Sequence, residues 1–246
     1  MDSIYSIREL SFSYNNNDVL FSNVNIDIPT KGITILVGTN GTGKTTFCRL
    51  LTSLTKGYKG CIYFQNKDLS TVSPSSLLDC VLYVKQDLTG NIMGLTPDED
   101  LKIWQNRFHY PDTLDKAELR EEAFQMIGAS SIRNEPIWNL SYGQKRRTML
   151  ATMPLFREKY WIMDEPSASL DTDGIHQLIQ LLNLKLTTGY GALILTHRID
   201  LFNDLLKINQ ISPTVESQKT AKKYIRPNNL YIIKDQKIIP YDPGIS

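Results

Sequence analysis

The chain has 246 residues, of which 41% are hydrophobic, and a formal net charge of +1 at pH 7. This length is sufficient for one α/β domain with a helical attachment and a well-buried core. The nearly balanced charge excludes the strongly basic composition that is typical of nucleic-acid binding, and no apolar run approaches the roughly 20 residues that a helix needs to span a bilayer.

The first 37 residues are predicted to form strands. Residues 1 to about 30 have the pattern of short strands, with a turn at 15–18 where three asparagines precede an aspartate. Residues 33–37 form a short apolar run that is rich in β-branched side chains. Such a run is typical of a strand that is buried on both faces.

The segment that follows matches the phosphate-binding pattern G-x-x-x-x-G-K-[ST] at every fixed position. Glycines allow successive backbone N–H groups to turn towards phosphate oxygens, and Lys44 can reach the β- and γ-phosphates, while the Thr45 hydroxyl can ligate Mg²⁺. A helix predicted over 46–54 would place its positive N-terminal end at the anion. The alternative is a chance glycine-rich turn. We therefore predict nucleotide binding by Gly38, Thr39, Asn40, Gly41, Thr42, Gly43, Lys44, Thr45 and Thr46.

A second glycine-containing motif occupies residues 140–144, with the sequence Leu-Ser-Tyr-Gly-Gln, in a helix-rich region from about 90 to 155. Ser141 and Gln144 fit a capping box, which would make the motif an ordinary helix start. In the alternative interpretation, the Ser141 hydroxyl and the Gly143 backbone address a γ-phosphate together with the helix dipole. Because residues 38–45 already surround one nucleotide, these donors would act on a nucleotide held by a partner subunit.

Three further apolar runs each end just before polar residues of the types that phosphoryl transfer requires: 80–84 before Gln86, 160–163 before Asp164 and Glu165, and 192–195 before His197. Apolar runs separated by helical stretches predict a parallel sheet with both faces covered. Ligands bind beyond the carboxyl ends of the strands in such sheets. We therefore expect all these polar residues at one edge of the sheet.

The roles of these residues follow from their charge and reach. Asp164 can hold Mg²⁺, directly or through water, and Glu165 can polarise or deprotonate the attacking water. Gln86 could contact the metal and the water, and His197 could hydrogen-bond the γ-phosphate or hold the water in line. The alternative for the two acids is a solvated turn, which Pro166 favours, and a single Gln or His is often an ordinary surface residue.

Near the C-terminus, three patterns are informative. Residues 178, 179, 181 and 182 are apolar at helical spacing and are predicted to be core. The polar segment 209–227 contains a cluster of lysines and an arginine, which we interpret as a solvated face. Residues 231–239 have the pattern of a hairpin, with apolar arms around a polar turn.

Taken in order, these motifs resemble those of the nucleotide-binding subunits of ATP-binding-cassette (ABC) transporters. Residues 38–45 match the phosphate loop, Gln86 the glutamine loop, 140–144 the signature, Asp164 and Glu165 the acidic pair, 169–171 the D-loop, and His197 the switch histidine. Tyr142 stands where a glycine is commonest, and Arg198 where an acid is frequent. Tyr14 is similar in position to the family's adenine-stacking aromatic residue, and its alternative is an edge-strand aromatic.

The resemblance implies a P-loop NTPase (RecA-like) α/β core with a mainly parallel sheet, an N-terminal antiparallel β subdomain and an inserted helical subdomain that carries the signature. We expect residues 1–88 and 156–246 to form the core and β subdomain, and 89–155 the helical subdomain. The family also implies ATP and Mg²⁺ as cofactors, and two ATPase subunits that sandwich two ATP molecules. The expected chain is thus an ATPase that powers a separate membrane permease, cytoplasmic and peripheral on the inner face of the membrane, with no nucleic-acid partner.

A narrower resemblance comes from residues 91–101, which are similar to the stretch after the glutamine loop in energy-coupling-factor and cobalt-type importers. The acidic run in this segment would equally suit a solvated helix start. The alternative functions are a soluble cassette ATPase, acting in iron–sulfur assembly, translation or on DNA, and a nucleotide-binding regulator without turnover. Glu165 disfavours the regulator, because it supplies the base for hydrolysis.

Overall fold

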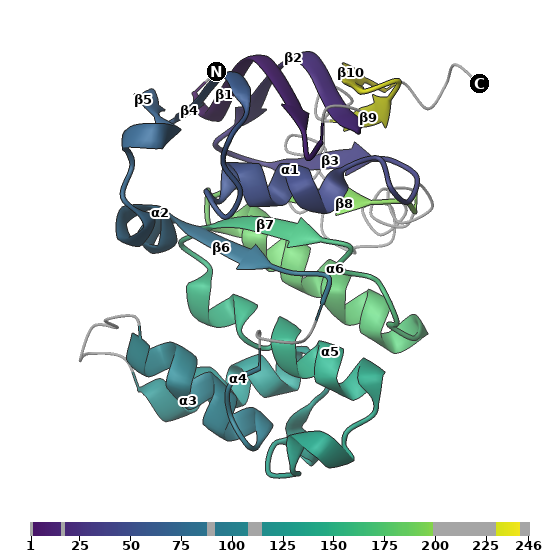
Figure 1. Cartoon of the computed structure of the whole chain (residues 1–246). Helices are drawn as coiled ribbons and strands as arrows, with labels where there is room; N and C mark the ends of the chain where they lie inside the picture. The colour runs from purple at the N-terminus through teal and green to yellow at the C-terminus, as the bar shows by residue number, and fades with distance from the viewer. Residues whose placement is uncertain (1, 16–17, 88–91, 108–114, 199–229, 242–246) are drawn as a thin grey trace, which may run out of the picture.

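The computed structural model describes residues 2–15, 18–87, 92–107, 115–198 and 230–241. Its strands are β1 Ser3–Ser13, β2 Val19–Pro29, β3 Ile33–Val37, β4 Lys59–Phe64, β5 Lys67–Asp68, β6 Val81–Val84, β7 Tyr160–Asp164, β8 Ala192–Thr196, β9 Leu230–Lys234 and β10 Lys237–Pro240. Its α-helices are α1 Lys44–Leu51, α2 Pro74–Cys80, α3 Pro97–Arg107, α4 Lys116–Met126, α5 Tyr142–Leu150 and α6 Thr172–Thr187. Short 3₁₀ turns occur at Leu69–Thr71, Ser130–Ile132, Ile137–Asn139 and Met153–Phe156. Figure 1 shows how these elements are arranged.

The larger sheet contains six strands in the order β10-β9-β3-β8-β7-β6. Strands β3, β8, β7 and β6 run parallel to their neighbours, so their carboxyl ends lie at one edge of the sheet. This arrangement confirms the predicted mainly parallel sheet. Strand β9 pairs with β3 in parallel and β10 returns antiparallel to β9, which confirms the predicted hairpin at 231–239.

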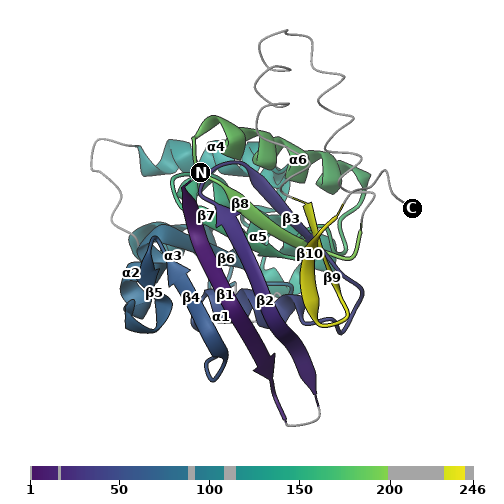
Figure 2. The same ribbon diagram turned by 90° about the horizontal axis from the view of Figure 1, so that it is seen from above.

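The two faces of this sheet are covered by different partners. Every residue of β3, β7 and β8 is buried, and successive side chains point to opposite faces. On one face, residues such as Ile162 pack with α1 and the N-terminal sheet, and on the other, residues such as Met163 pack with α6. Figure 2 shows α1 and α6 on opposite sides of the sheet. The four apolar residues predicted as core, 178, 179, 181 and 182, are buried in α6.

The N-terminal sheet is antiparallel, with strand order β2-β1-β4-β5, as expected. Strands β1 and β2 contain 11 residues each, so they are longer than the short strands predicted. Register shifts along the pair and positive φ angles at Glu9 (53°) and Asn23 (54°) mark irregularities of the β-bulge type. Such bulges interrupt the alternation of side chains without ending the strand, which explains the difference.

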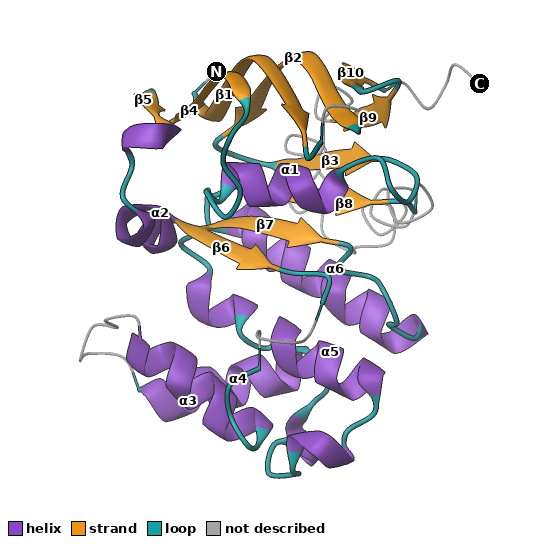
Figure 3. Ribbon diagram, in the orientation of Figure 1, coloured by secondary structure: helices purple, strands orange, loops and turns teal. Residues whose placement is uncertain are grey.

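The helical region lies below the central sheet in Figure 1, and Figure 3 shows its helices α3, α4 and α5 in purple below the orange strands. Helices α4 and α5 pack against α6, which connects this region to the core. The boundaries 1–88, 89–155 and 156–246 stay a prediction. None of the helices within the described ranges has the length and apolar content needed to span a bilayer.

Two predicted boundaries were wrong. The helix expected over 46–54 begins at Lys44, directly after Gly43 with φ 98°, and ends at Leu51, because Ser53 has a left-handed backbone with φ 56°. The strand expected from residue 80 begins at Val81, since Cys80 is the last residue of α2. The polar segment 209–227 lies outside the described residues.

Candidate active site

The phosphate-loop residues join β3 to α1 at the carboxyl edge of the sheet. A Cβ atom on Gly38 would lie 2.6 Å from the Thr42 hydroxyl oxygen, so any other residue there would displace the Thr42 side chain from its place in the loop. Gly41 and Gly43 have φ angles of 84° and 98°, which glycine adopts without strain. The loop therefore has the backbone that the sequence motif predicts, with α1 starting immediately after it.

Lys44 folds back over this loop. Its ammonium group donates hydrogen bonds to the carbonyl oxygens of Gly38 (2.7 Å) and Thr39 (3.1 Å), and its side chain is buried. The same nitrogen lies 3.1 Å from Glu165 Oε1. The three donors of the ammonium group are thus aimed at the loop and at the acidic end of β7.

Glu165 lies where the segments that follow three strands, β3, β7 and β8, come together. It follows β7 directly, is 2% exposed, and has a left-handed backbone with φ 49°. Its Oε2 atom lies 2.9 Å from His197 Nδ1 and accepts a hydrogen bond from the His197 backbone N–H (3.3 Å). Lys44 is the first residue of α1, after the loop that follows β3, and His197 directly follows β8, so the predicted convergence at the carboxyl edge occurs at this carboxylate.

Asp164 is fully buried at the end of β7. Among the described residues, neither carboxylate oxygen has a hydrogen bond of ordinary geometry. Burial raises the pKa of this carboxyl, and the nearby Thr45 hydroxyl and Lys44 only partly oppose the rise. A buried carboxylate without such partners is costly unless a cation or donor joins it, so the solvated-turn alternative is wrong for Asp164 and Glu165.

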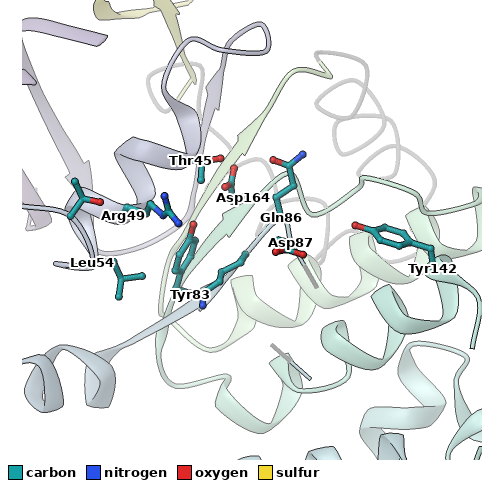
Figure 4. A pocket seen from close by; sticks show the side chains of 10 residues that line it. Thr45, Arg49, Leu54, Tyr83, Gln86, Asp87, Tyr142 and Asp164 are labelled. Carbon is teal, nitrogen blue, oxygen red and sulfur yellow. The ribbon is translucent and has the colours of Figure 1, made fainter. Parts of the chain in front are cut away.

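Gln86 shares a cavity of about 720 Å³ with Thr45 and Asp164. Figure 4 shows the Thr45 and Asp164 side chains together, with the Gln86 side chain beside them and Tyr142 farther along the same cavity. The cavity is also lined by Arg49, Leu54, Thr55, Tyr83, Lys85 and Asp87. A hydroxyl, a carboxylate and an amide oxygen therefore converge on a space large enough for a ligand.

Ser141 and Gly143 lie apart from this cluster, at the start of α5. Ser141 Oγ accepts a hydrogen bond from the Gln144 N–H (3.2 Å), and Gln144 Oε1 accepts one from the Ser141 N–H (2.8 Å), so the predicted capping box is present. Among the hydrogen bonds of the described residues, none joins Ser141 or Gly143 to the loop 38–46. The Tyr142 side chain, where a glycine is commonest in the family, is 53% exposed.

Tyr14 lies beside the first turn of α1. Its hydroxyl is 3.2 Å from the Thr46 hydroxyl oxygen, and its ring packs edge-on against Phe12 with centroids 5.0 Å apart. Half of the side chain is exposed. Tyr14 and Thr46 are therefore brought together at the margin of the phosphate loop, although 32 residues separate them.

Two interactions that sequence reasoning missed connect α5 to the catalytic edge. Arg147 donates two hydrogen bonds to Asp171 (2.5 and 2.7 Å), which also caps α6 through the Gly174 N–H (2.8 Å). Arg146 is fully buried and contacts the backbone around Gln86 and Glu165. The available signal was helical spacing, because Arg146 precedes the buried Met149 and Leu150 by three and four residues.

The acidic run after Gln86 is not a solvated helix start. Asp98 is 7% exposed and pairs with Arg133 (2.7 Å) and Lys102 (2.7 Å). Asp100 is fully buried and accepts hydrogen bonds from the N–H groups of Met93 (2.6 Å) and Gly94 (3.1 Å). These carboxylates therefore hold the segment 93–100 in place, and that alternative is wrong.

Comparison with known proteins places this site in a family. The family model described as ABC transporter matches residues 21–168, which is more than half of the chain. The chain belongs to this family. It is accordingly an ATP-binding subunit with ATPase activity.

Among similar proteins, an energy-coupling factor transporter ATP-binding protein (EcfA1) of Thermotoga maritima is 31% identical over 84% of this chain and 78% of its own length. A cobalt import ATP-binding protein (CbiO) of Salmonella typhimurium is 32% identical over 80% of this chain and 73% of its own length. These similarities are consistent with the narrower resemblance of residues 91–101.

The fold also matches solved structures. cbiO1 from Clostridium perfringens, part of the ABC transporter complex cbiONQ, has a TM-score of 0.72 at 22% identity, covering 97% of this chain and 88% of that one. A dimeric bacterial ABC transporter cassette has a TM-score of 0.73 at 19% identity, covering 95% of this chain and 96% of that one. At these identities, the likeness confirms the ABC ATPase fold.

Proposed function

We propose that this chain is the ATP-hydrolysing subunit of an importer of the energy-coupling-factor or cobalt type, and that it drives a separate membrane permease. Two subunits would dimerise head to tail around two ATP molecules. The observation that carries this proposal is the convergence of Lys44, Glu165 and His197 beside the buried Asp164 carboxylate, which accepts no hydrogen bond of ordinary geometry from the described residues. That arrangement fits phosphoryl transfer to water, which needs phosphate binding, a base and a place for a cation.

The residues present fit Mg²⁺. Magnesium in phosphoryl-transfer sites is held by one or two protein ligands together with substrate phosphates and water. Asp164 offers two carboxylate oxygens without hydrogen bonds from the described residues, and Thr45 and Gln86 line the same cavity. Within the described ranges, no group of three or more His, Cys, Asp or Glu side chains is placed to hold a metal. Bound there, the ion would neutralise charge on the phosphates.

Lys44 is positioned to change partners when a nucleotide binds. Its ammonium group contacts two loop carbonyls and Glu165. The β- and γ-phosphates would compete for these donors, because charge-assisted bonds to phosphate are stronger than bonds to neutral carbonyls. Glu165 would then be free to accept a proton from the attacking water, while His197 keeps its Oε2 atom oriented.

Ser141 can serve a partner's nucleotide without losing its cap. Its oxygen accepts from the Gln144 N–H, so its own O–H proton is available as a donor. The start of α5 adds the positive end of a nine-residue helix. We propose that Ser141 and the Gly143 N–H contact the γ-phosphate held by the partner's residues 38–46.

The permease would dock beside the cavity lined by Gln86 and beside the segment that follows Gln86 in the chain. This contact would hold the chain at the inner face of the membrane. Met93 and Leu95 are 40% and 62% exposed, and Asp100 anchors the backbone beside them. Exposed apolar side chains on a fixed backbone are suited to protein contacts. Copurification from detergent-solubilised native membranes tests this part. A stoichiometric polytopic companion is expected, whereas a purely soluble companion would contradict it.

The hydrolytic role is tested with Glu165→Gln. The amide cannot take a proton from water, so turnover should fall by about 100-fold or more while ATP still binds. With hydrolysis blocked, ATP should drive dimerisation, measured by light scattering. Near-normal phosphate release would remove Glu165 as the base, and a purely monomeric variant at saturating ATP would contradict the head-to-tail dimer.

A further inference from the structure

Arg146, in the helix that follows the signature, is the most extensively bonded buried cation of the described residues. Its side chain is fully buried, and its five N–H groups face backbone carbonyls. The contacts are Nε to Pro166 (3.3 Å), Nη1 to Lys85 (2.9 Å) and Gln86 (3.1 Å), and Nη2 to Asp164 (3.4 Å) and Glu165 (2.5 Å), with Nη1 also 3.9 Å from the Met149 sulfur.

These carbonyls belong to two separate loops. Lys85 and Gln86 lie 61 and 60 residues before Arg146, directly after β6, and residues 164–166 lie 18 to 20 residues after it, at the end of β7. No carboxylate of the described residues forms an ion pair with Arg146. Its hydrogen bonds to oxygen therefore all go to backbone carbonyls, and a guanidinium is suited to this because its donors form a rigid planar fork.

The Glu165 backbone is one of the groups that Arg146 holds. Its φ of 49° is a left-handed conformation that a non-glycine residue adopts only when its surroundings hold it there. The shortest Arg146 hydrogen bond goes to the carbonyl of Glu165. Without the guanidinium, five backbone carbonyls, including that of Glu165, would lose a buried charged donor. The backbone at Glu165 would then be free to relax.

We propose that Arg146 is a positioning residue that couples the signature helix to the Gln86 and Glu165 loops. This inference rests on the proposed head-to-tail dimer, in which Ser141 contacts one ATP while Gln86 and Glu165 act on the other. Helix α5 carries Ser141 at its start and Arg146 on its second turn, so engagement of the signature at one ATP shifts the residues that hydrolyse the second. The two ATP sites of a dimer are thereby made cooperative.

The alternative is that Arg146 only stabilises the fold, and Lys185 provides the matched control for that. Lys185 is also fully buried and also donates to two backbone carbonyls, those of Arg157 and Lys159. Its carbonyls precede β7 and lie outside the candidate active site. Loss of this buried donor by Lys185→Met thus tests stability alone, whereas Arg146→Met tests stability and coupling together.

The experiment compares wild type, Arg146→Met, Arg146→Lys and Lys185→Met as full-length purified chains. It measures the affinity for a fluorescent ATP analogue, the kcat and Hill coefficient of ATP hydrolysis per folded molecule, and thermal unfolding. For Arg146→Met we expect affinity within about 3-fold of wild type, because residues 38–46 are untouched. We expect kcat to fall about 100-fold through misplaced groups, and the Hill coefficient to fall to about 1.

The Arg146→Lys variant keeps the positive charge, but its single nitrogen cannot reach both loops. Its thermal stability should therefore be closer to the wild-type value than its Hill coefficient is. Lys185→Met should keep the wild-type kcat per folded molecule and the wild-type Hill coefficient. Equal fractional losses of kcat in Arg146→Met and Lys185→Met would overturn the proposal. If Arg146→Met does not fold, wild-type kcat and cooperativity in Arg146→Lys would overturn it.

The Glu165→Gln dimerisation test separates this proposal from the one it rests on. A Glu165→Gln chain that stays monomeric with ATP would count against the dimer itself. The other outcome is that the Glu165→Gln chain dimerises with ATP and the Arg146→Met chain has wild-type kinetics. That result would overturn only the role of Arg146.

Discussion

The two edges of the central sheet accommodate buried charge in different ways. At the carboxyl edge, Asp164 and Glu165 are both buried, Lys44 lies 3.1 Å from Glu165, and the Asp164 oxygens have no hydrogen bond of ordinary geometry from the described residues. At the amino edge, Lys185 donates to the carbonyls of Arg157 and Lys159, and its ammonium group lies 4.6 Å from the centre of the Trp161 ring.

The difference shows which edge is organised for a ligand. The amino edge satisfies its cation with carbonyls and rings of the same chain, as a structural core does. At the carboxyl edge, the Asp164 oxygens are buried acceptors that receive no hydrogen bond of ordinary geometry from the described residues. This arrangement lowers stability unless a cation or a donor binds there.

The largest expected effect is that of Asp164→Asn at the carboxyl edge. The amide removes a buried negative charge and keeps the shape, so hydrolysis should fall by about 100-fold or more while thermal stability is unchanged or higher. Initial rates over a Mg²⁺ titration and a thermal melt measure the two effects. Retention of Mg²⁺-dependent turnover would show that Asp164 is not a ligand.

If Asp164 is a Mg²⁺ ligand, the Mg²⁺ requirement of wild-type ATP hydrolysis should depend on pH. Burial raises the pKa of Asp164, so the carboxylate is protonated at a higher pH than an ordinary aspartate. The Mg²⁺ concentration needed for half-maximal rate should therefore increase as the pH falls, beginning above the usual titration range of aspartate. A constant Mg²⁺ requirement down to that range would contradict the assignment.

Lys185→Met tests the amino edge, where the expected effect is on stability. Burial lowers the pKa of Lys185 to about 7. Unfolding restores an ordinary lysine pKa of about 10.4, so between these values the unfolded chain binds more protons and the stability of the folded chain rises with pH. The methionine variant lacks this contribution.

The free energy of unfolding, wild type minus Lys185→Met, should therefore increase between pH 7 and 9 by up to about 1 kcal/mol per pH unit. Chemical denaturation at a series of pH values measures it. A difference that is flat with pH would mean that Lys185 stays charged in the folded chain, held by the two carbonyls, the Trp161 ring and the Tyr190 ring, whose centre lies 5.3 Å from its ammonium group.

Sequence reasoning worked where the signal is local. The phosphate loop is readable because its glycines and Lys44 lie within eight residues, and the strand ends because an apolar run followed by a polar residue marks each one. Element boundaries were predicted less well. Helix α1 ends before Ser53, which has a left-handed backbone, and the presence of a serine does not predict that conformation.

Interactions across long sequence separations were not predictable in this way. Arg146 sits in a basic run and looks like a surface residue, because its partners are up to 61 residues away. Asp98 looks solvated for the same reason, since the groups that pair with it include Arg133, 35 residues later. Charge alone favours the surface, and only the tertiary contacts reveal that these residues are buried.

The smallest expected effect belongs to Tyr14, at the margin of the carboxyl edge. If its half-exposed ring stacks on adenine, Tyr14→Ala should weaken ATP binding by about 10-fold, whereas Tyr14→Phe, which keeps the ring, should stay within about 2-fold of wild type. Titration with a fluorescent ATP analogue measures both. Equal losses in the two variants would assign the effect to the contact between the Tyr14 and Thr46 hydroxyls. The ring would then only pack on Phe12 after the end of β1, which lies inside its sheet and not at an edge, and the carboxyl edge would recognise phosphates and metal without recognising the base.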